Sequence, residues 1–217
     1  MKYGESAFDI FYLIFAVSVG VSILHKRGGR AGRLMGSAVL ILGIGDAFHL
    51  VPRVLNYFAD ADFTPWLGIG KLVTSITMTV FYLLMYRLWL DVYDARENRG
   101  LSVLVYALTA VRIILCLLPQ NGWLQNESSV LWGVVRNIPF VALGCVIVWL
   151  YFGKRDVVPA FRCVWLLVAL SFLFYIPVAA AAGILPMLGM LMLPKTVCYM
   201  ILIWIFRKYA FEPERES

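Results

Sequence analysis

Seven ionisable residues lie inside stretches of sequence that are otherwise apolar, and they are the residues best placed to do chemistry. They are Asp46, His49, Arg53, Lys71, Arg112, Arg136 and Lys195. An ionisable side chain in the middle of a membrane helix costs roughly 2.5–3.5 kcal/mol on insertion scales, so it usually faces the interior of a bundle or an aqueous cavity. We therefore treat these seven as candidate substrate-binding residues.

The carboxylate and the imidazole of this set can exchange protons, and they share a helix face with an arginine. Asp46, His49 and Arg53 stand three and four positions apart, which places them on one side of a helix at successive depths. At the rise of an α-helix, Asp46 lies about 18 Å from the start of its helix and Lys195 roughly 13 Å from the start of another. These similar depths predict an ion pair between Asp46 and Lys195. Such a pair could form part of a site or could only lock two helices together.

The other basic residues of the set predict a net-positive site in one half of the membrane. Lys71, Arg112 and Arg136 are expected in the same half as Arg53. If they face inward, they form a vestibule that would bind a carboxylate, a phosphate or a lipid head group. Alternatively, Lys71 and Arg136 could extend outward to the membrane interface, and Arg53 could do the same or form an internal ion pair.

Long apolar runs must position these residues. The chain has 217 residues, of which 62% are hydrophobic and 15% are charged, whereas a soluble domain is nearer half apolar and a quarter charged. Apolar runs of about 20 residues recur along the whole length, and each is long enough to cross a bilayer. We predict an all-α membrane protein, with residues 1–217 forming a single polytopic domain. Its seven transmembrane helices are expected at about 7–25, 33–57, 66–90, 101–119, 130–152, 161–182 and 186–208.

The connections between these runs indicate an orientation. Lys and Arg follow the first, third, fifth and seventh helices, whereas the other connections carry almost none apart from Arg53. The positive-inside rule then places the N-terminus outside and the C-terminus in the cytoplasm, as in a multi-pass protein of the cell membrane. The net charge of +6 is explained by this topology and by an internal site. The lipid bilayer is the expected partner, and nucleic acid is not.

The two halves of the chain carry similar landmarks. Pro65 opens the third helix and Pro186 the seventh, each followed two residues later by Leu-Gly; Pro52 and Pro177 lie late in the second and sixth. These landmarks suggest a parallel repeat of helices 1–3 and 5–7 with helix 4 as a linker, although apolar segments containing prolines also align by chance. The layout resembles that of SWEET-type sugar transporters and, more loosely, of rhodopsin-like proteins. This resemblance covers the whole chain at the level of topology, without a shared motif, and it implies a site between the two helix triplets.

Smaller features of the helices concern packing. Thr74, Ser75 and Thr79 form a hydroxyl stripe that is expected to bond backbone or a neighbouring helix, or to line a hydrophilic path. Gly45 and Gly70 would permit close approach of two helices. Tryptophans near the ends of the apolar runs, including Trp123, are expected in the membrane interface.

Three functions fit these observations. The first, which we favour, is a transporter or carrier for a small anionic or polar solute, in which Asp46 and His49 couple movement to protons. The second is a metal-free membrane-embedded enzyme acting on a lipid or amphiphile, with the same two residues as a general acid–base pair. The third is a seven-helix ligand-binding receptor or retinal-type photoreceptor with Lys195 as the attachment site. We expect no metal and no cofactor for the first two, because His25 and His49 are the only histidines and no CxxC motif occurs.

Overall fold

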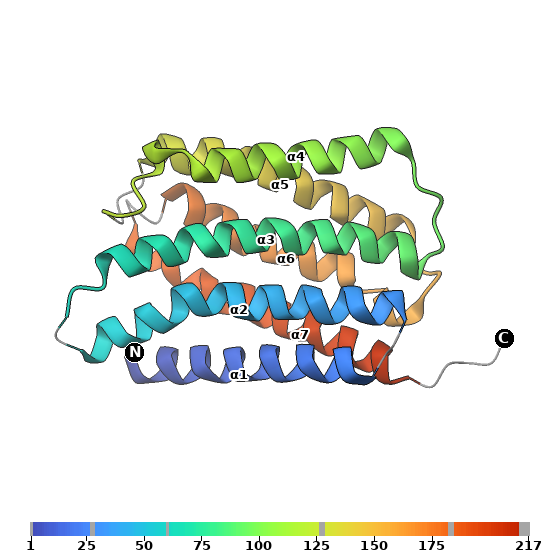
Figure 1. Ribbon diagram of the computed structural model, residues 1–217, viewed down its shortest axis with the longest axis horizontal. Helices are drawn as coiled ribbons and strands as arrows, with labels where there is room; N and C mark the ends of the chain where they lie inside the picture. The colour runs from blue at the N-terminus through green and yellow to red at the C-terminus, as the bar shows by residue number, and fades with distance from the viewer. Residues whose placement is uncertain (1, 27–28, 60, 126–128, 182–184, 213–217) are drawn as a thin grey trace.

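The chain forms a bundle of seven helices in the computed structural model, which describes residues 2–26, 29–59, 61–125, 129–181 and 185–212. All seven helices are long and apolar enough to cross a membrane, as expected for a multi-pass protein (Figure 1). The helices are α1 (Lys2–Lys26), α2 (Arg30–Phe58), α3 (Thr64–Val92), α4 (Arg99–Leu117), α5 (Val130–Gly153), α6 (Val164–Ala181) and α7 (Met192–Phe211). Short 3-10 turns precede three of them, at η1 (Pro119–Asn121), η2 (Pro159–Phe161) and η3 (Pro186–Leu191).

The start of α7 differs from the sequence-based expectation. The α-helix begins at Met192 rather than at Pro186, because the intervening residues form the 3-10 turn η3. Pro194 lies in the first turn of α7, where its missing backbone N–H costs little. Lys195 therefore lies near the N-terminus of an α-helix and not in its middle.

Helices that follow one another in sequence pack side by side, and α1 also packs against α7. The N-terminus lies at one end of the bundle and the C-terminus at the other (Figure 1). We call these the N-terminal end and the basic end. The basic end holds the last turns of α1, α3, α5 and α7 and the first turns of α2, α4 and α6 (Figure 1). Most Lys and Arg residues lie at that end, namely Lys26, Arg30, Arg33, Arg87, Arg96, Arg99, Lys154, Arg155, Arg162, Arg207 and Lys208.

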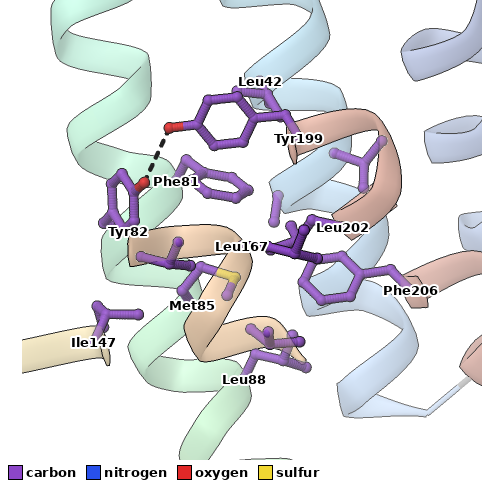
Figure 2. Close-up of a cluster of buried hydrophobic side chains, with 14 of the residues drawn as sticks. Leu42, Phe81, Tyr82, Met85, Leu88, Ile147, Leu167, Tyr199, Leu202 and Phe206 are labelled. Atoms are coloured by element: carbon purple, nitrogen blue, oxygen red, sulfur yellow. Dashed lines mark hydrogen bonds between the residues drawn. The ribbon is translucent and has the colours of Figure 1, made fainter. Parts of the chain in front are cut away.

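A buried aromatic core fills the bundle toward the basic end. Figure 2 shows Phe81 and Tyr82 of α3 facing Tyr199 of α7, with the two tyrosine hydroxyls hydrogen bonded at 2.9 Å. Nearby, Tyr151 of α5 donates to the Met85 carbonyl over 3.0 Å, linking α5 to α3. Lipid is as apolar as these side chains, so close packing and interhelical hydrogen bonds hold the helices together here.

The contact between α2 and α3 depends on two glycines and a proline. A Cβ atom on Gly45 would collide with Thr77, and one on Gly70 would collide with the backbone at Phe48 and His49. Pro52 supplies no N–H to the Phe48 carbonyl, and that carbonyl lies against Gly70. The close approach expected from these glycines is confirmed, and it brings His49 of α2 beside α3.

Candidate functional site

A cavity of about 350 Å³ lies inside the N-terminal half of the bundle. Its walls come from every helix except α1 and from the connection between α4 and α5. Five of the seven predicted site residues line it, namely His49, Lys71, Arg112, Arg136 and Lys195. No Asp or Glu belongs to its described lining. Basic side chains from α3, α4, α5 and α7 and the imidazole of His49 on α2 thus converge on one space.

Arg112 is the most deeply buried charged residue of the site. Its side chain is 1% exposed, and its guanidinium donates to the backbone carbonyl of Arg136 on α5. The guanidinium also lies 5.1 Å from the centre of the Phe140 ring. Among the described residues, its Nε has no hydrogen-bond partner and no carboxylate pairs with it. A buried cation without an acidic partner is costly, so this group is well suited to receive an anion.

Arg136 is held in place by residues that follow α4. It donates to the side-chain oxygen of Asn121 over 2.8 Å, and its guanidinium lies 4.4 Å above the Trp123 ring. Asn121 is fully buried and donates to the carbonyls of Leu115 and Leu118 over 2.7 and 2.8 Å. These carbonyls at the end of α4 have no partner within the helix. The α4 C-terminus and the arginine are therefore fixed by the same amide.

Trp123, which the sequence predicts in the membrane interface, packs against the bundle and forms part of the site. Its indole N–H donates to the Cys116 carbonyl over 2.8 Å, and its ring lines the cavity under Arg136. The backbone of Trp123 lies directly against Gly68 of α3, where any larger residue would collide with it. Residues 119–123 are thereby packed onto the bundle beside the cavity.

Lys195 points its ammonium group between two tyrosine rings. The Nζ atom is 5.1 Å from the centre of the Tyr175 ring and 5.4 Å from that of Tyr199. The expected ion pair with Asp46 is not formed, since no carboxylate among the described residues lies within 4.0 Å of Lys195. Asp46 instead accepts a hydrogen bond of 2.7 Å from the Tyr12 hydroxyl of α1. The two charges remain close enough to interact electrostatically.

Asp46 and Arg53 do not line the cavity, although they share a helix face with His49. Arg53 pairs with Glu5 of α1 at 3.3 Å and donates to the Tyr57 hydroxyl over 3.4 Å. The internal ion pair that we considered for Arg53 is therefore its observed role. The acidic start of α1 draws it away from the cavity.

His49 and the start of α3 complete the polar wall. The Nδ1 atom of His49 is buried and has no partner among the described residues. Thr74 donates to the Gly45 carbonyl over 3.0 Å, and Ser75 donates to the carbonyl of Lys71 over 2.7 Å. The hydroxyls thus bond backbone, as expected for membrane helices, and both residues also line the cavity.

Two further polar residues of the site, Asn137 and Tyr175, were not predicted from the sequence. Tyr175 donates to the side-chain oxygen of Asn137 over 2.8 Å, and the Asn137 amide donates to the Gly133 carbonyl over 2.8 Å. Both residues line the cavity. Asn137 directly follows Arg136 in an apolar run, which was the available signal. Tyr175 looked like one more aromatic residue in a hydrophobic helix.

The described part of the chain holds no cluster of three His, Cys, Asp or Glu side chains that could bind a metal ion. Comparisons with protein-family models, curated proteins and solved structures found no match to this chain. The resemblance to SWEET-type transporters accordingly rests on the seven apolar helices alone.

Proposed function

We propose that this protein is a membrane transporter for an anionic solute. The solute binds in the cavity lined by Lys71, Arg112, Arg136 and Lys195, which we call the basic cavity. The observation that carries the proposal is Arg112, a buried guanidinium with no acidic partner in the described structure, on the wall of a cavity shared with Lys195. Charge-assisted hydrogen bonds from guanidinium and ammonium groups are the strongest that side chains offer to carboxylates and phosphates. A cavity of about 350 Å³ has the size of a small-molecule site.

We infer an orientation with the N-terminus outside, because the basic end would then face the cytoplasm. The cavity lies in the opposite half of the bundle and would receive its solute from outside. On the cytoplasmic side of the cavity, the Tyr82–Tyr199 hydrogen bond and the aromatic core around it close the path. This arrangement is that of an outward-facing state, with the aromatic core as the inner gate of an alternating-access cycle.

Asp46 is a suitable proton acceptor for coupling in such a cycle. It lies near Lys195 but behind the cavity wall, with one hydrogen bond from Tyr12. Protonation of Asp46 would raise the positive potential at Lys195 and so favour an anion in the cavity. Binding of a proton and of the solute would then reinforce each other.

A catalytic role is the second candidate, supported by the buried and unpartnered Nδ1 of His49 on the cavity wall. In that case His49 would act as a general base on a bound lipid or amphiphile. Retinal, the ligand of the photoreceptor hypothesis, fits the chemistry of this cavity less well than an anion does. Retinal is an apolar chain, and the cavity around Lys195 carries three further cationic side chains, those of Lys71, Arg112 and Arg136.

Uptake into proteoliposomes tests the transport proposal. Radiolabelled phosphate and radiolabelled succinate serve as probes, with chromatography of the recovered label to detect conversion. We expect uptake of at least one anion by the unchanged protein and its loss in Lys195→Met, with Lys208→Met as a matched control at the basic end of the same helix. Uptake that is equal in Lys195→Met and Lys208→Met would refute the proposal, and a chemically altered label would favour the enzyme.

A further inference from the structure

A second hollow lies on the outside of the bundle, along the seam between α5 and α6. It has a volume of about 410 Å³. Apart from Asn137 and Tyr175, its lining consists of apolar side chains and a glycine, namely Gly133, Val134, Ile138, Val141, Ala142, Ile176 and Ala179. Ile138 is 63% exposed, and Val134 and Ile176 are also exposed. In a membrane these side chains face lipid, so the groove is a place for hydrocarbon.

The groove and the basic cavity share part of their walls. Gly133, Asn137, Tyr175 and Ala179 line both. At the seam the two helices lie close together but are not wedged by bulky side chains, since a Cβ atom on Gly133 would just reach van der Waals contact, 3.5 Å from the Ala179 carbonyl. The hydrogen bond from Tyr175 to Asn137 spans this boundary. A molecule that extends from the cavity into the groove therefore has to part α5 from α6 at this point and break the hydrogen bond from Tyr175 to Asn137.

The chemistry changes sharply across this boundary. On the inner side lie Arg112, Arg136 and Lys195, and on the outer side the groove offers no charged side chain. A ligand that fills both spaces must have an anionic head and a hydrocarbon tail. The groove of about 410 Å³ follows a single seam, and we match it with a single hydrocarbon chain.

We propose that the solute of this transporter is a single-chain anionic amphiphile, whose head group binds in the basic cavity while its hydrocarbon chain lies in the α5–α6 groove. This inference rests on the proposed function and names its substrate class. The amphiphile enters sideways from the membrane leaflet at the N-terminal end, between α5 and α6. Its chain remains in contact with lipid throughout, so only the head group has to exchange water for the basic groups of the cavity.

Three matched probes separate the contributions of head and chain. Dodecyl phosphate carries both, methyl phosphate carries the head alone, and dodecanol carries the chain alone. Binding is measured by native mass spectrometry of the full chain released from a zwitterionic detergent. We expect dodecyl phosphate to bind at least tenfold more tightly than either of the others.

Two variants test the groove directly. Ala142→Phe fills the groove without touching the basic cavity, and Ala110→Phe adds the same bulk to a lipid-facing position on α4. We expect Ala142→Phe to weaken binding of dodecyl phosphate at least fivefold and to leave methyl phosphate unchanged, whereas Ala110→Phe changes neither. Near-native thermal unfolding of both variants shows that the fold is kept.

The outcomes distinguish this inference from the function on which it rests. If methyl phosphate binds as tightly as dodecyl phosphate and Ala142→Phe has no effect, the amphiphile is refuted while an anion site remains. If dodecanol binds as tightly as dodecyl phosphate, the groove holds hydrocarbon regardless of the basic cavity and the inference is also refuted. If neither phosphate binds, or if Lys195→Met leaves their binding unchanged, the proposed function fails.

Discussion

The hydroxyl of Tyr175 donates a hydrogen bond of 2.8 Å to the side-chain oxygen of Asn137, and it ties α6 to α5 where the basic cavity meets the apolar groove. The same tyrosine ring lies 5.1 Å from the ammonium of Lys195. One side chain thus contacts the seam between two helices and a cation of the site. Any ligand that opens the seam must also alter the surroundings of Lys195.

Removal of this hydrogen bond should ease passage through the seam. Tyr175→Phe keeps the ring near Lys195 but cannot donate to Asn137. One hydrogen bond makes a net contribution of about 0.5–1.5 kcal/mol to folding stability. We expect a small loss of thermal stability together with faster association of dodecyl phosphate, measured by stopped-flow fluorescence in nanodiscs. Unchanged association would show that the seam is not on the path of entry.

Arg112 should dominate the affinity for an anion. Arg112→Met removes charge-assisted hydrogen bonds of about 1.5–3 kcal/mol, so we expect binding of radiolabelled phosphate to weaken roughly tenfold to a hundredfold. Arg112→Lys keeps the charge but loses the planar guanidinium, so its phosphate affinity should lie between that of the unchanged protein and that of Arg112→Met. Equilibrium binding at fixed ionic strength measures the effect, and binding by Arg112→Met as tight as that of the unchanged protein would contradict it.

Arg53 should have no part in binding, because it pairs with Glu5 outside the cavity. We expect Arg53→Met to change phosphate affinity by less than about twofold while it lowers the melting temperature, since Glu5 loses its cationic partner and keeps only the Tyr57 hydroxyl. The double variant Arg53→Met, Glu5→Gln should recover part of that stability. A large loss of affinity in Arg53→Met would mean that the cavity extends farther toward α1 than the structure indicates.

Neutralisation of Asp46 should strengthen anion binding. Asp46→Asn keeps an acceptor for the Tyr12 hydroxyl but removes a negative charge near Lys195, so phosphate affinity is expected to rise by roughly threefold to tenfold. If Asp46 carries the coupled proton, acid outside the vesicles should accelerate uptake by the unchanged protein and not by this variant. Uptake that responds to acid equally in both would place coupling elsewhere.

The orientation is testable with two exposed positions. Asp62 lies between α2 and α3, and Arg96 lies between α3 and α4 at the opposite end. We expect an impermeant maleimide to label Asp62→Cys on intact cells, and Arg96→Cys only after permeabilisation, relative to the unsubstituted protein. The reverse labelling pattern would show the opposite orientation, in which the cavity lies in the cytoplasmic half of the membrane.

Much of this fold and site can be predicted from the sequence because charge inside an apolar run is a strong signal. The seven helices and the convergence of Lys71, Arg112, Arg136 and Lys195 follow from that signal together with the loop charges. The parallel repeat of helices 1–3 and 5–7 stays a prediction.

What the sequence could not supply is the choice of partner between helices. A shared helix face does not decide between the cavity and the neighbouring helix. In the structure Asp46 accepts a hydrogen bond from Tyr12 and Arg53 pairs with Glu5, both on α1, and hydropathy does not predict these partners. The roles of Trp123 and Asn121 at the site could not be predicted, because they depend on contacts between distant segments, such as that of Trp123 with Gly68.

Binding of an anion in the basic cavity is tested most directly by anomalous scattering from selenate. Crystals grown from the full chain in lipid and soaked in selenate should show an anomalous peak within hydrogen-bond reach of Arg112 and Lys195. The same soak of Lys195→Met crystals should show a much weaker peak. Selenate found only at the basic end, with the cavity empty of it, would contradict the account.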